Sequence, residues 1–270
     1  MKLVFLYVEL NSIFAIKYNK LKRTIMKKAL LTICIVIAAL STQAQSFRLG
    51  VSGGVNSTWL MNKNVFDAND GLDIATSFGG RFGIDAIYSF NDKAGISIGF
   101  NFLSTHNQKY TGEAGSADYD LTTKLKYLDI PILFRLTSSG GTYFELGPQI
   151  GILGTAKEDF ESSNPSVFGL DYDDRNVKSG FNSTNIAIIL GFGVDIDVTE
   201  KIFITTGLRL GYGLSDVTEE YETPLELAIS TASNTVQYAH IDDDGDFHYE
   251  KTSRAFGGLH LGVSYKFGGE

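Results

Sequence analysis

The chain has 270 residues, and its 31 acidic side chains outnumber its 23 basic ones, which gives a formal net charge of −8 at pH 7. This acidic excess argues against a role in nucleic-acid binding, because proteins that bind nucleic acid carry basic patches. After residue 45 no stretch reaches 18 consecutive apolar residues, which excludes a membrane-spanning helix there.

The first 44 residues have the pattern of a targeting region. Residues 26–28 read Met-Lys-Lys, residues 29–40 are apolar except for Thr32, and residues 42–44 read Thr-Gln-Ala, with a cleavage site expected near Gln45. This run is too short to cross a bilayer as a helix, and its flanks are typical of a cleavable secretory signal peptide, with a buried helix as the alternative.

The chain is therefore predicted to have three parts. Residues 1–25 are an N-terminal extension, explained by a misassigned start codon or, alternatively, by an N-terminal anchor. Residues 26–44 are the signal peptide, and residues 45–270 are one domain. The only cysteine, Cys34, lies in the signal peptide, so the exported chain would have no disulfide or thiol chemistry.

Eight stretches after the signal peptide alternate apolar and polar residues with the period of a β-strand. They are residues 47–59, 76–90, 94–106, the two arms of a hairpin at 126–153, and residues 185–198, 201–215 and 251–267. In the hairpin each arm alternates over roughly ten residues around a short turn, which is typical of transmembrane β-strands.

The connections between these stretches alternate in length. Short turns are expected near Asn91, Ser139 and Thr199. Long loops are expected at residues 60–75, 110–121, 157–182 and 216–250. Short turns at one end and long loops at the other are typical of an up-and-down outer-membrane barrel. We predict an all-β fold, an eight-stranded antiparallel transmembrane β-barrel that follows a cleavable signal peptide.

Alternation alone also fits a soluble lipocalin-like barrel, in which the apolar face points inward. Here the polar face consists mainly of glycine and serine with isolated charges of both signs, which suits the narrow interior of an eight-stranded barrel. Aromatic residues gather near strand ends, as in the interfacial girdles of membrane barrels. A closed sheet also leaves no unpaired edge in lipid. We therefore expect the apolar face to meet lipid.

The charged residues on the polar face are expected to form a network in the lumen. Buried charges are costly unless they are paired, so we predict that this network holds a closed interior together. Its predicted members are Arg81, Asp85, Asp129, Arg135, Glu145, Asp195, Asp197, Arg209, His260 and Lys266.

Two prolines fall within the predicted hairpin. Pro131 and Pro148 have no N–H to donate to a strand ladder, and proline in sheets is usually found at edges or bulges. We therefore predict a β-bulge at each position.

The same hairpin carries a family resemblance. The segments YLDIPILFRL (residues 127–136) and ELGPQIGIL (residues 145–153) resemble the outer-membrane β-barrel family of Bacteroidota that includes the PorT-like proteins, and residues 43–45 resemble the cleavage region of their signal peptides. The resemblance implies a location in the cell outer membrane. The family is functionally mixed and has no catalytic motif to carry over.

Ser104 and His106 are the most plausible catalytic pair. They lie two residues apart at a strand end, so they share a face. Small barrel enzymes that trim lipid A use a serine–histidine pair near the outer rim. In this sequence the usual order is reversed and no acid follows in an obvious orienting position, so we predict that the protein is not an enzyme.

The last long loop is strongly acidic. Between Asp216 and Glu250 it holds ten acids and no lysine or arginine. Asp242, Asp244 and Asp246 take positions one, three and five of a loose calcium-loop pattern, but the glycine stands at position four instead of six, and Ser253 replaces the usual glutamate at position twelve. Ca²⁺ is thus the only cofactor that the sequence suggests, and only weakly; such loops could also engage the divalent cations that bridge lipopolysaccharide.

The sequence supports three functional hypotheses. The first is a non-enzymatic outer-membrane barrel with acidic extracellular loops, in a structural or surface-interaction role. The second is an accessory component of a protein secretion apparatus, as the PorT-like resemblance implies. The third, which the missing catalytic set disfavours, is a lipid-modifying enzyme of the outer leaflet. The expected partners are outer-membrane lipid and lipopolysaccharide, the outer-membrane assembly machinery during biogenesis, and a protein partner that the sequence does not identify, but not nucleic acid.

Overall fold

The computed structural model describes residues 46–63, 72–114, 117–164, 171–220, 239–241 and 247–267. The predicted extension (1–25), the predicted signal peptide (26–44) and the calcium candidates Asp242, Asp244 and Asp246 lie outside the described residues. No helix in the described part of the chain is long and apolar enough to cross a membrane.

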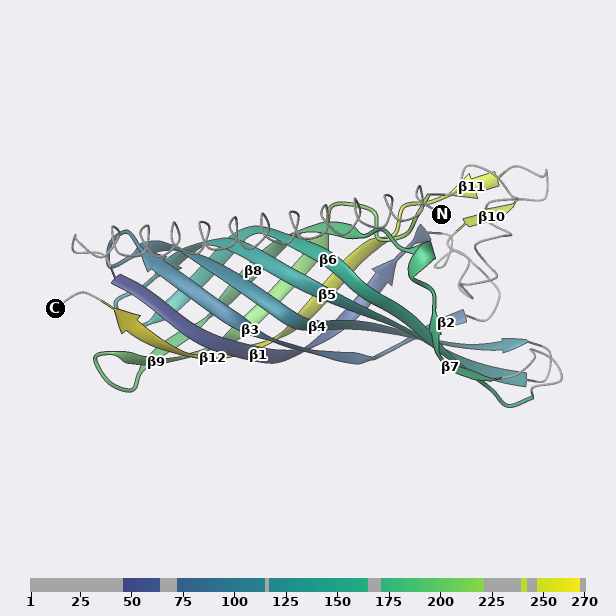
Figure 1. Cartoon of the computed structure of the whole chain (residues 1–270), viewed down its shortest axis with the longest axis horizontal. Helices are drawn as coiled ribbons and strands as arrows, with labels where there is room; N and C mark the ends of the chain where they lie inside the picture. Colours follow the sequence, from purple (N-terminus) through teal and green to yellow (C-terminus); the bar gives the residue numbers. More distant parts are fainter. Residues whose placement is uncertain are drawn as a thin grey trace, which may run out of the picture. The chain divides into compact units, whose positions relative to one another are not determined.

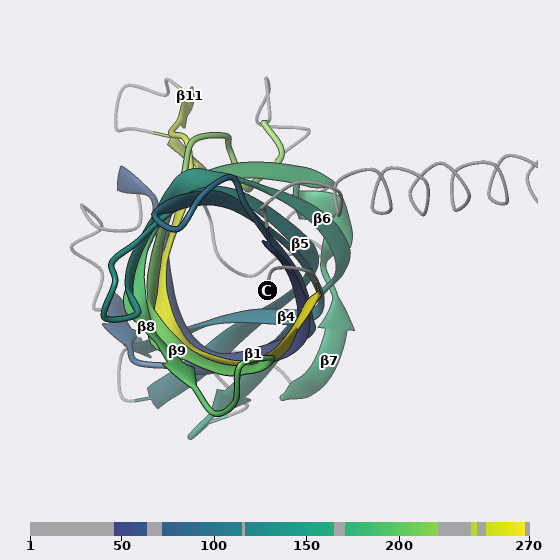
Figure 2. The ribbon, with the colours of Figure 1, turned by 90° about the vertical axis from the view of Figure 1, so that its left-hand side faces the viewer.

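Within the described residues, eight long strands pair side by side in one closed antiparallel ring, seen end-on in Figure 2. In ring order they are β1 (Ser46–Met61), β3 (Phe78–Ser89), β4 (Ala94–Ala114), β5 (Ala117–Thr137), β6 (Thr142–Ser162), β8 (Thr184–Asp197), β9 (Ile202–Gly213) and β12 (Ser253–Phe267), and β12 pairs back onto β1. The predicted all-β antiparallel barrel is confirmed.

Short elements surround the long-loop end of this ring, on the right in Figure 1. β2 (Leu72–Ala75) pairs with the outer part of β4, and β7 (Tyr172–Asn176) pairs with the outer part of β6. The short 3₁₀ helix η1 (Lys178–Gly180) follows β7, and β10 (Ala239–Ile241) pairs with β11 (Phe247–Tyr249).

The apolar side chains of the strands point outward. In β5, Phe134 and Leu136 are 48% and 45% exposed, whereas Arg135 between them is 2% exposed. The same alternation runs through β6 and β8. This is the reverse of a soluble barrel, and it matches strands whose outer face meets lipid.

The three short turns close the opposite end of the ring, as predicted. The side-chain oxygen of Asn91 accepts hydrogen bonds from the backbone N–H groups of Lys93 and Ala94, both at 2.9 Å. Thr199 caps its turn in the same way. Gly141 has a φ of +83°, a left-handed conformation that suits glycine.

Two predicted loops are wrong. Residues 110–114 and 117–121 instead continue β4 and β5 outward, and residues 157–162 continue β6. Their pairing persists to Ala114↔Ala117 and Tyr119↔Ser162. We call the outer parts of β4, β5 and β6, together with β2 and β7, the projecting sheet (Figure 1). Its strands form because their inner face packs into an apolar cluster, the outer apolar core, whose buried members are Leu60, Tyr110, Leu121, Leu125, Tyr127, Leu153, Ala156, Phe160, Val177, Phe181 and Val217.

The predicted bulges at the two prolines are also wrong. The register between β4 and β5 is the same on both sides of Pro131, but no pair forms at Pro131 itself. The β5–β6 ladder likewise skips Pro148, while β6–β8 pairing is continuous there. Because proline has no N–H to donate, each proline interrupts the ladder with one of its two neighbouring strands, and the register of that ladder does not change. The register shifts lie elsewhere, between Asn101 and Ser104 and between Lys126 and Tyr127.

Candidate functional site

The half of the lumen nearest the short turns is organised around Glu145 on β6. One carboxylate oxygen accepts a hydrogen bond from Arg135 Nη1 at 2.8 Å, and the other accepts two from Arg209, at 3.1 Å from Nε and 2.9 Å from Nη2. Glu145 has no exposed surface. Such a carboxylate is stabilised only because two guanidinium groups compensate its lost hydration.

Asp195 on β8 extends this network across the lumen. It accepts a hydrogen bond from Arg135 Nη2 at 2.7 Å and from the Thr205 hydroxyl at 2.8 Å, and it pairs with Arg48 Nη2 at 2.8 Å. Arg48 also stacks over the Phe203 ring, with its Cζ 4.8 Å from the ring centroid. The chain Arg209–Glu145–Arg135–Asp195–Arg48 is therefore continuous, and we call it the inner ion network.

Glycines make room for this network. The guanidinium of Arg135 lies 3.7 Å from the centroid of the Tyr143 ring, whose hydroxyl lies over Gly193 of the neighbouring strand β8 and Gly207 of β9. A Cβ atom on Gly193 would lie 2.6 Å from that hydroxyl oxygen. Glycine on the polar face thus makes room for a large side chain that lies along the inner wall of a narrow barrel, as the glycine-rich pattern of that face predicts.

A second polar cluster lies further toward the long-loop end, around Asp129 on β5. The hydroxyl of Ser104 donates to Asp129 Oδ2 at 2.6 Å, and His106 Nε2 lies 3.0 Å from the same oxygen. Arg254 Nη2 lies 3.5 Å from the other oxygen. On its far side, His106 Nδ1 lies 3.0 Å from the Thr58 hydroxyl. We call these residues the outer polar cluster.

This cluster corrects the expectation that no acid accompanies Ser104 and His106. All three groups meet, but the geometry is not that of a nucleophilic relay, in which histidine stands between serine and acid. Here the same His106 nitrogen faces both Ser104 and Asp129, and the serine proton already points to the carboxylate. The adjoining cavity measures about 10 Å³, which is room for one water molecule. This arrangement holds side chains together and offers no space for an acyl chain.

The other predicted lumen residues divide into two groups. Asp85 and His260 are buried, with His260 Nε2 3.6 Å from Asp85 Oδ2, and Arg81 is half-buried and donates to the Leu259 carbonyl at 3.4 Å. Asp197 and Lys266, in contrast, are not part of the network: Asp197 is exposed and Lys266 is half-buried without an ion pair to a described acid. Both lie near strand ends at the short-turn rim, beyond the buried part of the lumen.

Sequence reasoning missed three important lumen residues. Arg48 lies on the predicted polar face of its strand, and this alternation was the available signal. His106 has the phase of the apolar face, and the register shift between Asn101 and Ser104 turns it into the lumen. Arg254 lies at the start of β12 and reaches Asp129 across 125 residues of sequence. Its guanidinium stacks on the Tyr127 ring at 4.3 Å.

The outer end of the lumen is covered by apolar and hydrogen-bonded layers. Tyr127, two residues beyond Asp129 on the same face, begins the outer apolar core. Above it, Asp216 accepts hydrogen bonds from the backbone N–H groups of Thr218 (3.1 Å) and Thr252 (3.0 Å) and from the Tyr249 hydroxyl (2.8 Å). Burial raises the pKa of this tyrosine. Asp216 thereby joins the segment after β9 to the segment before β12.

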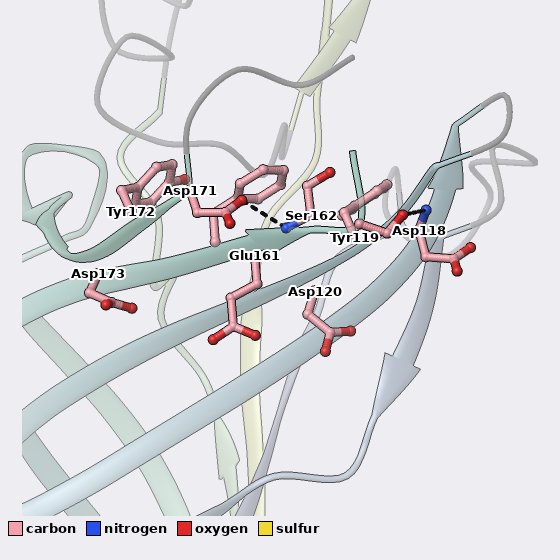
Figure 3. Close-up of a pocket in the computed structure, with 10 residues that line it drawn as sticks. Asp118, Tyr119, Asp120, Glu161, Ser162, Asp171, Tyr172 and Asp173 are labelled. Carbon is pink, nitrogen blue, oxygen red and sulfur yellow. Dashed lines mark hydrogen bonds between the residues drawn. The ribbon is translucent and has the colours of Figure 1, made fainter. Parts of the chain in front are cut away.

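The tip of the projecting sheet holds a pocket of about 590 Å³ (Figure 3). Three of its acids, Asp120, Glu161 and Asp173, point to one side of the sheet, while Tyr119 and Tyr172 point to the other. On that second side Phe160 stacks between the two tyrosines, with ring centroids 5.9 Å and 5.6 Å apart. The residues that line the pocket are Asp118, Tyr119, Asp120, Phe160, Glu161, Ser162, Ser163, Asp171, Tyr172 and Asp173.

Charges below this tip are paired on the outer surface of the sheet. Lys124 forms an ion pair with Asp159, and this hydrogen bond raises the pKa of the lysine. Lys157 donates to Asp174 at 3.0 Å, which lowers the pKa of that carboxyl. Asp118, Glu161 and Asp173 at the tip, in contrast, form no ion pair with any basic residue of the described ranges.

The described residues contain no group of three or more histidine, cysteine, aspartate or glutamate side chains placed to hold a metal ion. The acidic tip residues are therefore not arranged as a compact metal centre. Because Asp242, Asp244 and Asp246 lie outside the described residues, Ca²⁺ binding by that segment remains a prediction from sequence.

Comparison with known proteins identifies the family of this chain. A family model described as an outer membrane protein β-barrel domain matches residues 43–219. No curated protein matches the chain.

Among solved structures, the chain is similar to the Neisserial surface protein A (15% identity, 83% of this chain and 100% of that one, TM-score 0.37) and to OprG from Pseudomonas aeruginosa (15%, 85% and 99%, TM-score 0.37). It is also similar to Ail, the attachment invasion locus protein of Yersinia pestis (12%, 82% and 99%, TM-score 0.33). Since the family model covers well over half of the sequence, the chain belongs to the outer membrane protein β-barrel domain family and is a protein of the cell outer membrane.

Proposed function

We propose that this protein is a non-enzymatic surface-interaction protein, in which a filled barrel anchors the projecting sheet and presents its acidic tip to a basic partner outside the cell. The observation that carries the proposal is the tip itself. Asp118, Glu161 and Asp173 are exposed and lack a cationic partner among the described residues, beside a pocket of ligand size.

The packing of the lumen supports a barrel that anchors the protein and a projecting sheet that binds the partner. Its inner ion network and outer polar cluster fill the barrel with paired groups, and the cavity between them holds about 10 Å³. Catalysis of lipid trimming would need a nucleophile that a lipid can reach, whereas Ser104 is 3% exposed and points inward. Interaction chemistry is therefore assigned to the projecting sheet.

The filled lumen makes a first prediction. Refolded protein in planar lipid bilayers is expected to show no large steady conductance, because the ion pairs leave no continuous path for water through an eight-stranded barrel. Single-channel recording, with an open porin as positive control, checks this. Large, long-lived current steps would mean that the lumen is open.

The acidic tip makes a second prediction. In refolded protein, the triple change Asp118→Asn, Glu161→Gln and Asp173→Asn is expected to weaken binding of a fluorescent oligolysine peptide by at least about tenfold, since removal of unpaired charges lowers electrostatic attraction. Fluorescence anisotropy at low and at physiological salt measures the affinity.

A matched control separates the tip from net charge. Asp92→Asn, Asp197→Asn and Glu200→Gln remove the same charge from exposed positions at the short-turn end. This variant should bind the peptide like the wild type. If the two triple variants lose affinity equally, the tip is not the binding surface and the proposal fails.

An accessory role in protein export is a second candidate, suggested by the resemblance of residues 127–136 and 145–153 to PorT-like proteins. With a filled lumen, such a role would operate through the projecting sheet and not through transport of the polypeptide along this barrel. Loss of secreted proteins in a deletion strain, restored by the wild type but not by the tip variant, would favour it.

A further inference from the structure

Along the outer surface of β5 and β6, the residue types change abruptly where the membrane-facing band ends. Leu128 and Ile152 form the last apolar cross-strand pair, and the next polar position places Lys126 opposite Thr155. The step coincides with the register shift between Lys126 and Tyr127.

A second lysine reaches the same place from outside the barrel. Lys178 in η1 donates from Nζ to the carbonyl oxygen of Gly154 at 2.8 Å, and Gly154 adjoins Thr155, the cross-strand partner of Lys126. The two lysines therefore adjoin one short stretch of β6, residues 154–155. Gly154 and Thr155 are both exposed, so the surface between the lysines is open.

These two lysines differ from the lysines further out. Lys124 and Lys157 are neutralised by Asp159 and Asp174. Lys126 is exposed and forms no ion pair with an acid of the described ranges, and Lys178 uses a single hydrogen bond to a neutral carbonyl. Among the lysines of β5, β6 and η1, the two without an ion pair to a described acid thus lie directly above the apolar band.

The chemistry at that level in an outer membrane is specific. The outer leaflet carries phosphorylated glycolipids, whose phosphate groups lie between the acyl chains and the sugars. A lysine ammonium is a standard phosphate partner, and basic residues beside a membrane-spanning segment attract anionic headgroups. Because the apolar side chains of β5 and β6 fix the depth of the acyl chains, the two lysines lie at the depth of the phosphates.

We propose that Lys126 and Lys178 form a binding site for the phosphate groups of an outer-leaflet glycolipid on the β5–β6–η1 face of the barrel. The ammonium groups hold the phosphates, Thr155 supplies a hydroxyl donor between them, and Leu128 and Ile152 contact the acyl chains below. This site is independent of the acidic tip and would fix the orientation of the barrel against the lipid.

The test compares full-length refolded barrel in detergent micelles with purified diphosphorylated lipid A and with the same lipid after removal of both phosphates, counting bound lipid by native mass spectrometry. The wild type should retain the phosphorylated lipid and release the other. The double variant Lys126→Gln with Lys178→Gln should retain the phosphorylated lipid at least about tenfold more weakly. The binding that remains should decrease as the salt concentration rises.

A matched control removes the same charge elsewhere. Lys93→Gln with Lys201→Gln changes two exposed lysines of the short turns and should leave lipid retention unchanged. Single Lys126→Gln and Lys178→Gln variants, each with an intermediate loss, serve if the double variant does not refold. Equal retention by wild type and Lys126/Lys178 variants, equal binding of the dephosphorylated lipid, or displacement of the lipid by millimolar inorganic phosphate would each overturn the proposal.

Discussion

Replacing Glu145 by alanine is expected to lower the free energy of unfolding of the refolded barrel by about 3–5 kcal/mol. The glutamate is fully buried and holds Arg135 and Arg209 on its two carboxylate oxygens. Without it, Arg209 keeps no carboxylate partner within the inner ion network. Urea unfolding in lipid vesicles, followed by the fluorescence of Trp59, the only tryptophan of the chain, measures the loss.

Two further variants make this result specific. Glu200→Ala removes an acid from an exposed turn and should change stability by less than about 0.5 kcal/mol. Glu145→Met with Arg209→Met should recover part of the loss, because it removes both charges while Arg135 keeps Asp195 at 2.7 Å. A loss below about 1 kcal/mol for Glu145→Ala would show that water or a shifted side chain compensates the arginines, contrary to a packed lumen.

Which strand residues point to lipid and which point to the lumen could be predicted from sequence, because side chains of a strand alternate between its two faces. Once Phe134 is assigned to lipid, Arg135 must face the lumen, and the same reasoning holds for Glu145 and Asp195. Pairing partners could not be predicted in this way. Closure of the ring brings Arg48 to Asp195 and Arg254 to Asp129, and local alternation carries no information about such distant contacts.

The errors have related causes. Asp197 was placed in the lumen by the phase of its strand, but alternation does not show where a strand leaves the packed interior. Residues 110–121 contain glycines and acids and were predicted as a loop. In the structure, residues 110–114 and 117–121 are strand because their partners and the outer apolar core stabilise them, so tertiary packing outweighs local propensity. The prolines cause no bulge because each one loses its pairing with only one of its two neighbouring strands.

The outer apolar core makes the second large prediction. Phe160→Ala is expected to destabilise the projecting sheet by about 3–5 kcal/mol while leaving the membrane-embedded ring folded. Phe160 is 5% exposed and stacks against Tyr119 and Tyr172, so its removal leaves a cavity between β5, β6 and β7. Tryptic cleavage at Lys109 and other projecting-sheet lysines should become at least about a hundredfold faster, since local opening governs such cleavage.

The control for this experiment is Phe78→Ala. Phe78 lies at the outer end of β3, is 68% exposed and is not part of the outer apolar core, so its loss should leave tryptic cleavage nearly unchanged. Resistance of the remaining barrel to trypsin and its shift on unheated gels would report an intact ring. If Phe160→Ala unfolded ring and projecting sheet together, the two would be one cooperative unit. The anchor and the interaction surface would then not be separable, because the packing around Phe160 would stabilise the lumen as well as the tip.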